Sequence, residues 1–263
     1  MNQALSLLLK RHSDVCSASS NVIEWSAPVP VFGDPVKARV ATLGLNPSNR
    51  EFVDQNGTEL SGKYRRFHTL TSLGLQRWTD ATSKHVSMLE ETCSNYFTGN
   101  PYDLWFRALD RVIASTGASY YSRSACHLDL IPYATACKWV ALRPIERSRL
   151  MEMSAEALAL LLLQSKISVL ILNGRTVAES LQRMTDISLS AMEMKDWTLP
   201  RANGEGVKGI SYTGTLTQVL GRPLKRKVHV LGFNHNIQSS FGVTGAVKRS
   251  ISDWLERRTK ESI

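Results

Sequence analysis

Four polar residues stand directly after apolar runs of the sequence, in positions where an α/β protein often carries its chemistry. They are Asn46, Asp129, Asn173 and His235. An amide can orient a water molecule, a carboxylate can accept hydrogen bonds, and an imidazole can donate one to developing negative charge. The same residue types also form tight turns, and the Asn-Gly step at 173–174 suits a turn. Asn46, Asp129 and His235 together predict a functional site.

The apolar runs before these residues are predicted to be strands, and the segments between them helices. The four predicted strands cover residues 38–45, 124–131, 167–172 and 227–233. The four predicted helices cover residues 101–115, 148–164, 176–184 and 247–259. Apolar runs that alternate with helices are typical of a doubly wound parallel sheet, whose ligands bind beyond the carboxyl ends of the strands. We therefore expect an α/β fold of three layers, α/β/α, around a four-stranded parallel sheet.

The length and organisation of the chain indicate one domain. Its 263 residues suffice for a sizeable α/β core, and no internal repeat or long linker divides them. We predict a single domain over 1–263 with a helical and irregular lead-in over 1–37, and a loop or small hairpin within 185–226. No apolar run is long enough to cross a bilayer, and the N-terminus lacks the pattern of a secretion signal. We expect a cytoplasmic monomer.

Cysteine spacing and glycine patterns argue against several classes of protein. None of the four cysteines falls in a CxxC pair, so the usual zinc and iron–sulfur patterns are absent. The sequence also lacks the GxxxxGK[ST] and GxGxxG phosphate-binding patterns, which counts against common nucleotide-binding enzymes. We expect neither a metal nor a cofactor.

The chain is basic, with 32 Lys and Arg against 23 Asp and Glu and a formal net charge of +9. A surplus of this size suits a polyanionic partner such as DNA, although it also serves solubility. The candidate phosphate contacts are three basic clusters at 63–66, 222–227 and 248–249. Within them, the predicted DNA-binding residues are Arg65, Arg66 and Lys248.

Three motifs in order carry a resemblance to a known family. Gly44-Leu-Asn-Pro-Ser48 is similar to the Gly-x-Asn-Pro-Gly motif of the mismatch-specific and single-strand-selective uracil-DNA glycosylases. His127-Leu-Asp-Leu-Ile-Pro132 resembles the second strand of that superfamily, where a pyrimidine-reading Asn stands three residues before a Pro. His235-Asn-Ile-Gln238 follows the last predicted strand, where the superfamily has a His-Pro-Ser-Pro loop. The chain thus resembles the uracil-DNA glycosylase superfamily over about residues 38–255.

The resemblance implies a monofunctional DNA glycosylase that flips a base out of DNA and hydrolyses its bond to the sugar. Asn46 would position the attacking water, and His235 would donate a hydrogen bond to the departing base. Because the last motif lacks both prolines, Asn234 and His235 are both candidates for the family's histidine position. Phe52 or Phe67 would stack on the flipped base, although a Phe is more often part of a core.

Asp129 stands where the family has its pyrimidine-reading Asn. An ionised Asp only accepts hydrogen bonds, so it suits the exocyclic amine of cytosine better than the carbonyl of uracil. Excision of ordinary cytosine would damage the host, so we expect a 5-substituted cytosine such as the glucosylated hydroxymethylcytosine of phage DNA, and a role in anti-phage defence. The alternatives are a uracil or mismatch glycosylase of base-excision repair, with Asp129 protonated, and a non-catalytic DNA-binding protein. Asp129 could also be a structural cap or ion pair.

The loop after the last predicted strand is expected to contact DNA as well. Gln238 and Ser239 are predicted DNA-binding residues of this loop. Ile237 is predicted to fill the gap that a flipped base leaves in the duplex, because apolar side chains suit an unstacked step, and Phe241 is the alternative.

Overall fold

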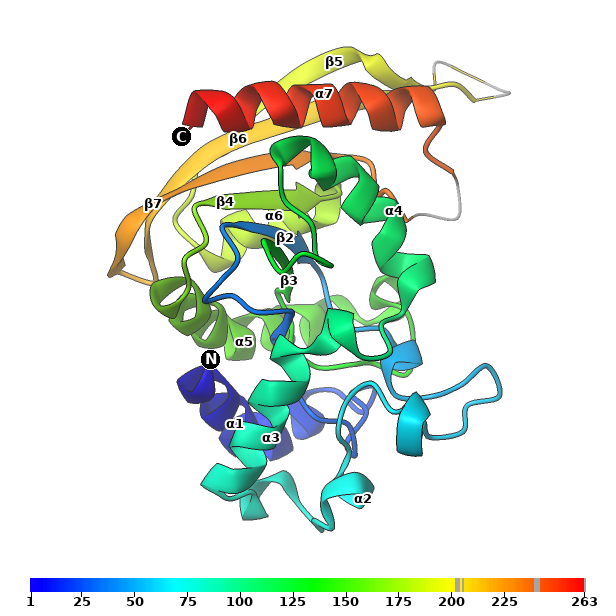
Figure 1. Cartoon of the computed structure of the whole chain (residues 1–263), viewed down its shortest axis with the longest axis vertical. Coiled ribbons are helices and arrows are strands. Elements are labelled where there is room, and N and C mark those ends of the chain that lie inside the picture. Colours follow the sequence, from blue (N-terminus) through cyan, green and yellow to red (C-terminus); the bar gives the residue numbers. More distant parts are fainter. Residues whose placement is uncertain (202–203, 205, 239–241, 263) are drawn as a thin grey trace.

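Seven strands form a single mixed sheet in the order β1-β3-β2-β4-β7-β6-β5 (Figure 1). The computed structural model describes residues 1–201, 204, 206–238 and 242–262 of the chain. The strands, with their bounds, are β1 (Val31–Phe32), β2 (Val40–Gly44), β3 (Ala125–Asp129), β4 (Val169–Asn173), β5 (Ser190–Leu199), β6 (Val207–Val219) and β7 (Arg222–Phe233).

The centre of the sheet consists of the four strands that the apolar runs predict. Strand β2 pairs in parallel with both β3 and β4, and β4 pairs in parallel with β7. All five residues of β3 and of β4 are buried, as expected for strands covered on both faces. The predicted α/β class is confirmed.

The sheet is wider than the predicted four strands, because β1, β5 and β6 pair antiparallel at its edges. The prediction of a loop or small hairpin for 185–226 misses most of this extension. Strand β5 has ten residues, only one of which is buried, so it lacks the apolar run that marks a core strand.

In the described residues, seven α-helices accompany the sheet: α1 (Asn2–Ala18), α2 (Leu70–Leu73), α3 (Ser83–Ser94), α4 (Asp103–Ile113), α5 (Pro144–Gln164), α6 (Arg175–Met184) and α7 (Gly245–Ser262). Helices α4 to α7 lie where helices are predicted, and α5 begins earlier, with Pro144 in its first turn. Helix α7 packs against α4, β5 and β7, and α5 packs against α6 and β7 (Figure 1). Six 3-10 helices are also present: η1 (Asn49–Glu51), η2 (Gly62–Tyr64), η3 (Trp78–Asp80), η4 (Tyr96–Thr98), η5 (Ala114–Thr116) and η6 (Trp139–Ala141).

The lead-in belongs to the same apolar core as the sheet. Leu5 and Leu8 of α1 are fully buried, and α1 packs against α5. In the described part of the chain, no helix combines the length and the apolar character needed to cross a membrane.

Candidate active site

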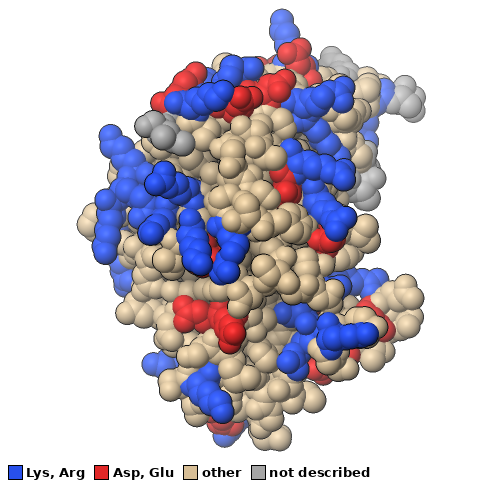
Figure 2. All heavy atoms as spheres, viewed as in Figure 1, with Lys and Arg blue, Asp and Glu red and all other residues tan. Residues whose placement is uncertain are grey.

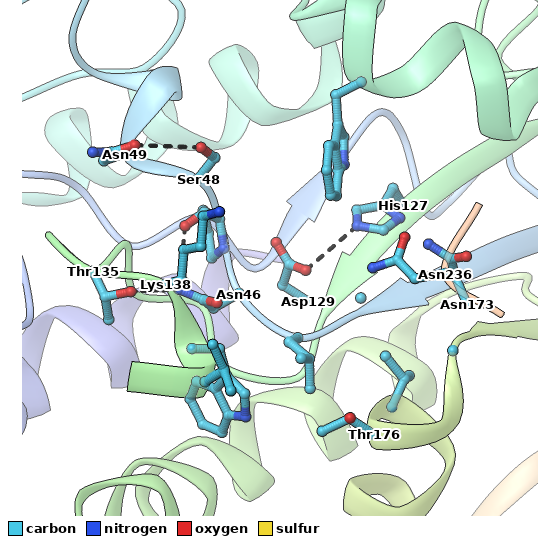
Figure 3. Close-up of a pocket in the computed structure, with 18 of the residues that line it drawn as sticks. Asn46, Ser48, Asn49, His127, Asp129, Thr135, Lys138, Asn173, Thr176 and Asn236 are labelled. Atoms are coloured by element: carbon cyan, nitrogen blue, oxygen red, sulfur yellow. Dashed lines mark hydrogen bonds and ion pairs between the residues drawn. The ribbon is translucent and has the colours of Figure 1, made fainter. Parts of the chain in front are cut away.

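A cavity of about 690 Å³ opens at the carboxyl ends of the central parallel strands (Figure 3). Each of these strands contributes to its lining at its carboxyl end or just after it. The residues are Gly44, Asn46, Asp129, Asn173 and Asn234. A volume of this size falls in the range of small-molecule and cofactor sites. The structure therefore brings Asn46 and Asp129 of the predicted site to one cavity, together with Asn173, for which the sequence favours a turn.

Asn46 is held so that one end of its amide stays available. Its Nδ2 donates to Thr135 Oγ1 at 3.0 Å and to the Tyr133 carbonyl at 3.4 Å. Within the described residues, no group donates a hydrogen bond to its Oδ1. Asn46 lines the cavity, so this free carbonyl oxygen can accept from a water molecule or a ligand there.

Asp129 belongs to a buried line of polar groups. Its Oδ1 lies 3.4 Å from His127 Nε2, and His127 Nδ1 lies 2.6 Å from Thr42 Oγ1, which is also 2.6 Å from the Tyr120 hydroxyl. Burial raises the pKa of the Asp129 carboxyl, and the hydrogen bond and charge of His127 oppose that increase. Figure 3 shows the Asp129 carboxyl beside the His127 imidazole, and both residues line the cavity.

The glycine of the Gly-Leu-Asn-Pro segment makes room for this pair. Gly44 is the register partner of Asp129 on the neighbouring strand. A Cβ added at Gly44 would lie 2.6 Å from Asp129 Oδ1 and 2.8 Å from His127 Nε2. Both distances are too short for a real side chain, so the two polar groups occupy the space that any other residue would need.

Glu51 is a cavity residue that the sequence analysis does not identify. It ends the short helix η1 and is one of the residues that line the cavity, although it is only 2% exposed. The Tyr96 hydroxyl lies 2.9 and 2.8 Å from its two carboxyl oxygens. Burial raises the pKa of Glu51 to about 8; Tyr96 and Arg66 oppose this, and the charge of Asp129 adds to it. A Glu in a polar loop is normally exposed, so its residue type alone gives no signal of burial.

The structure corrects the predicted position of His235. This residue is buried and is not among the residues that line the cavity. Its Nε2 lies 2.6 Å from the Trp197 carbonyl of β5, and a carbonyl can only accept, so Nε2 carries the proton. Burial lowers the pKa of His235, which keeps the ring neutral. The imidazole therefore connects the loop to β5 and does not point at a ligand.

Asn234, the alternative candidate, also has both ends of its side-chain amide hydrogen-bonded to the protein backbone. Its Nδ2 donates to the Lys208 carbonyl and its Oδ1 accepts from the Ile210 N–H, so its side chain joins β7 to β6. The next residue with a side chain toward the cavity is Asn236, which is exposed and lines it (Figure 3). Its Oδ1 accepts from the Gln238 N–H, and no acceptor for its Nδ2 occurs among the described residues. Within the described part of this loop, Asn236 therefore offers an available donor.

Phe52 and Phe67 do not reach the cavity, so the prediction that one of them stacks on a base is wrong. They are 1% and 2% exposed. Phe52 packs edge-on against Trp25, and Phe67 stacks on Tyr96. The aromatic residues that line the cavity are Phe32, Trp105, Phe106 and Trp139. Of these, Trp105 on α4 is the most exposed, at 36%.

The loop after β7 is tied to the end of β4. The Oδ1 of Asn173 accepts from the Ile237 N–H at 3.0 Å, and its Nδ2 donates to Gln238. Ile237 is only 2% exposed, so in this structure it is a core residue and the predicted insertion into a duplex is not available to it. Gln238 also donates to the Trp105 carbonyl. Ser239 and Phe241 lie outside the described residues.

The predicted phosphate contacts lie in different environments. Arg66 donates to the carbonyls of Arg50 and Asn100, and so braces the segment that carries Glu51. Arg65 is exposed, and Lys248 is half-buried in the first turn of α7.

The cluster at 222–227 lies away from the cavity. It begins β7, and Arg226 donates to the Ile167 carbonyl just before β4, whereas the cavity is at the opposite, carboxyl end of both strands. Figure 2 shows Lys and Arg side chains over several parts of the face in view, with Asp and Glu among them.

The described residues contain no group of three or more His, Cys, Asp or Glu side chains that could hold a metal ion. Neither a scan of the sequence against protein-family models nor a search of the curated proteins finds a match.

Proposed function

We propose that the chain is a monofunctional DNA glycosylase that hydrolyses the N-glycosidic bond of a flipped, modified pyrimidine and leaves an abasic site. The observation that carries the proposal is Asn46, which lines the cavity together with Asp129 and whose Oδ1 accepts from no described residue. The Gly-Leu-Asn-Pro segment around Asn46 resembles the water-positioning motif of the uracil-DNA glycosylase superfamily. Four mutually parallel strands with helices packed against them support the three-layer fold that the resemblance implies.

In the proposed reaction, Asn46 orients a water molecule toward C1′ of the flipped nucleotide. An amide is too weak a base to remove a proton, so its contribution is position. As the C1′–N1 bond breaks, positive charge develops on the sugar and negative charge on the base. Asn236, which lines the cavity and whose Nδ2 has no acceptor among the described residues, takes the donor role expected for His235.

The identity of the base depends on Asp129. As a carboxylate it accepts from the exocyclic amine of cytosine, and the neighbouring His127 favours that charged form. The cavity of about 690 Å³ exceeds the needs of a bare pyrimidine, which supports a base with a bulky 5-substituent such as glucosylated hydroxymethylcytosine. An enzyme of this kind would act in defence, by leaving abasic sites in phage DNA.

One observation favours a second candidate, a uracil or mismatch glycosylase of repair. Burial raises the pKa of Asp129, and a protonated carboxyl offers the donor and acceptor that uracil needs. The two candidates differ in the base released and agree on the bond that breaks.

The test is mass spectrometry of the bases released from three DNA duplexes: unmodified, uracil-containing and carrying glucosylated hydroxymethylcytosine. We expect release of the glucosylated base, and loss of that release in Asn46→Ala. Asn56→Ala is the matched control, because Asn56 is an exposed loop residue outside the cavity. Release of uracil alone would favour the repair enzyme. DNA binding without release of any base would make the chain a binding protein and overturn the proposal.

A further inference from the structure

We propose that Glu51 is a second catalytic residue of this site, which delivers a proton to the departing base. This inference rests on the proposed function, and it assigns a role to the one buried cavity carboxyl that the resemblance leaves without one. The two cavity carboxyls then have separate roles: Asp129 binds the base and Glu51 protonates it.

The chemistry favours such a group. When the C1′–N1 bond breaks, its electron pair goes to the base, and a cytosine without a proton source leaves as an anion. Amides such as Asn46 and Asn236 donate hydrogen bonds but do not transfer protons at neutral pH. His235, the expected partner of the base, is bonded to the Trp197 carbonyl. A carboxylic acid at the cavity supplies the missing proton.

The position of Glu51 fits this role. It lies five residues after Asn46 on the segment that leaves β2, so one segment carries both the water-orienting amide and the carboxyl. The Tyr96 hydroxyl bonds to its oxygens and is itself fixed by the Tyr102 N–H at 2.8 Å. A hydroxyl has a single proton to donate, so it serves one carboxyl oxygen at a time and leaves the other for a ligand.

The surroundings of Glu51 favour its protonated form. Among the described residues, its carboxyl takes part in no salt bridge: Arg66, whose charge lowers the pKa of Glu51, donates to two backbone carbonyls. A buried carboxylate without an ionic partner is costly. Burial raises its pKa to about 8 against the opposing effects of Tyr96 and Arg66, with the Asp129 charge adding to the increase. The group therefore holds its proton at neutral pH and can give it up within the cavity.

The step balances without another reactant. The water oxygen bonds to C1′ and the C1′–N1 bond breaks, while the Glu51 proton passes to the base. The proton released by the water returns to the Glu51 carboxylate, directly or through solvent. The products are the abasic sugar and a neutral base, and Glu51 is ready for the next turnover.

The experiment compares single-turnover base release from the duplex that the wild type cleaves, using Glu51→Gln, Tyr96→Phe and the control Glu152→Gln. Gln keeps the shape of Glu but cannot transfer a proton, so we expect release to fall by about 100-fold or more, with DNA binding retained. Glu152 is exposed on α5, and its variant should match the wild type.

A pH profile separates catalysis from a structural role. Wild-type release should decline as the pH rises through about 8, because Glu51 must be protonated. Tyr96→Phe removes a hydrogen bond that lowers the pKa of Glu51, so the decline should move to higher pH. Activity of Glu51→Gln within about threefold of wild type, or wild-type release that increases through pH 8, would overturn the inference and leave the proposed function standing. Absence of any release by the wild type would refute both.

Discussion

The carboxyl of Asp129 and the imidazole of His127 lie 3.4 Å apart on the same face of β3, over a glycine of the neighbouring strand. Residues two apart in a strand share a face, so the pairing follows from their spacing. His127 continues through Thr42 to Tyr120, which fixes the imidazole from the side away from the cavity. The charge of Asp129, on which the proposed choice of base rests, depends on this arrangement.

Replacing Gly44 with Ala should disrupt the pair. The new Cβ would lie 2.6 Å from Asp129 Oδ1, so the carboxyl and the imidazole must move. We expect a loss of unfolding free energy of about 1–3 kcal/mol, as for other overpacked sites, and a larger fractional loss of base release. Urea unfolding and the release assay measure the two effects. Gly245→Ala is the control, because the nearest atom to its added Cβ is 3.5 Å away. Normal release by a folded Gly44→Ala protein would show that the position of Asp129 is not critical.

Replacing Asp129 with Asn should change which base is released. An amide offers a donor and an acceptor, which matches uracil, and it loses the charge that favours an exocyclic amine. We expect release of the cytosine derivative to fall and release of uracil to rise, as measured by competition between the two duplexes in one reaction. Asp186→Asn, in an exposed position, should leave the preference as it is. An unchanged ratio in Asp129→Asn would remove this residue from base recognition.

The roles of His235 and Asn236 can be separated by two variants. His235→Gln loses a buried hydrogen bond to the Trp197 carbonyl, so we expect about 1 kcal/mol of destabilisation and near-normal release. Asn236→Ala loses the free donor at the cavity, so we expect nearly unchanged stability and a fall in release of about 10- to 100-fold. Thermal unfolding and single-turnover release provide the readouts. The reverse pattern would return the catalytic role to His235.

The sequence predicts the centre of the fold because the central strands are buried on both faces and appear as apolar runs. Strand β5 shows no such run, so the antiparallel extension is missed. At the site, Asn46 and Asp129 are predictable because each follows an apolar run. His127 could also have been identified, because it lies two residues before Asp129 and so shares its face of the strand. The sequence places His235 at the cavity, whereas the structure places Asn236 there. Neighbouring residues at the end of a strand point to opposite faces of the sheet, so an error of one residue selects the wrong side chain. Glu51 and Trp105 come from segments whose path depends on tertiary packing.

Glu51 should also make stability depend on pH. Its pKa is raised by burial to about 8 in the folded protein, whereas an unfolded Glu has a pKa of about 4.3. The folded state therefore holds this proton more tightly than the unfolded state. The resulting contribution of Glu51 to the free energy of unfolding is present at low pH and is lost as the pH rises toward and through about 8. Gln cannot ionise, so Glu51→Gln should not share this loss. Its free energy of unfolding relative to wild type should therefore increase by a few kcal/mol between pH 5 and pH 9, on the order expected for such a pKa shift. Urea unfolding of both proteins at each pH measures the difference, which does not require any enzymatic activity. If the two proteins keep a constant difference over this range, Glu51 is already ionised at pH 5 and cannot be the proton donor.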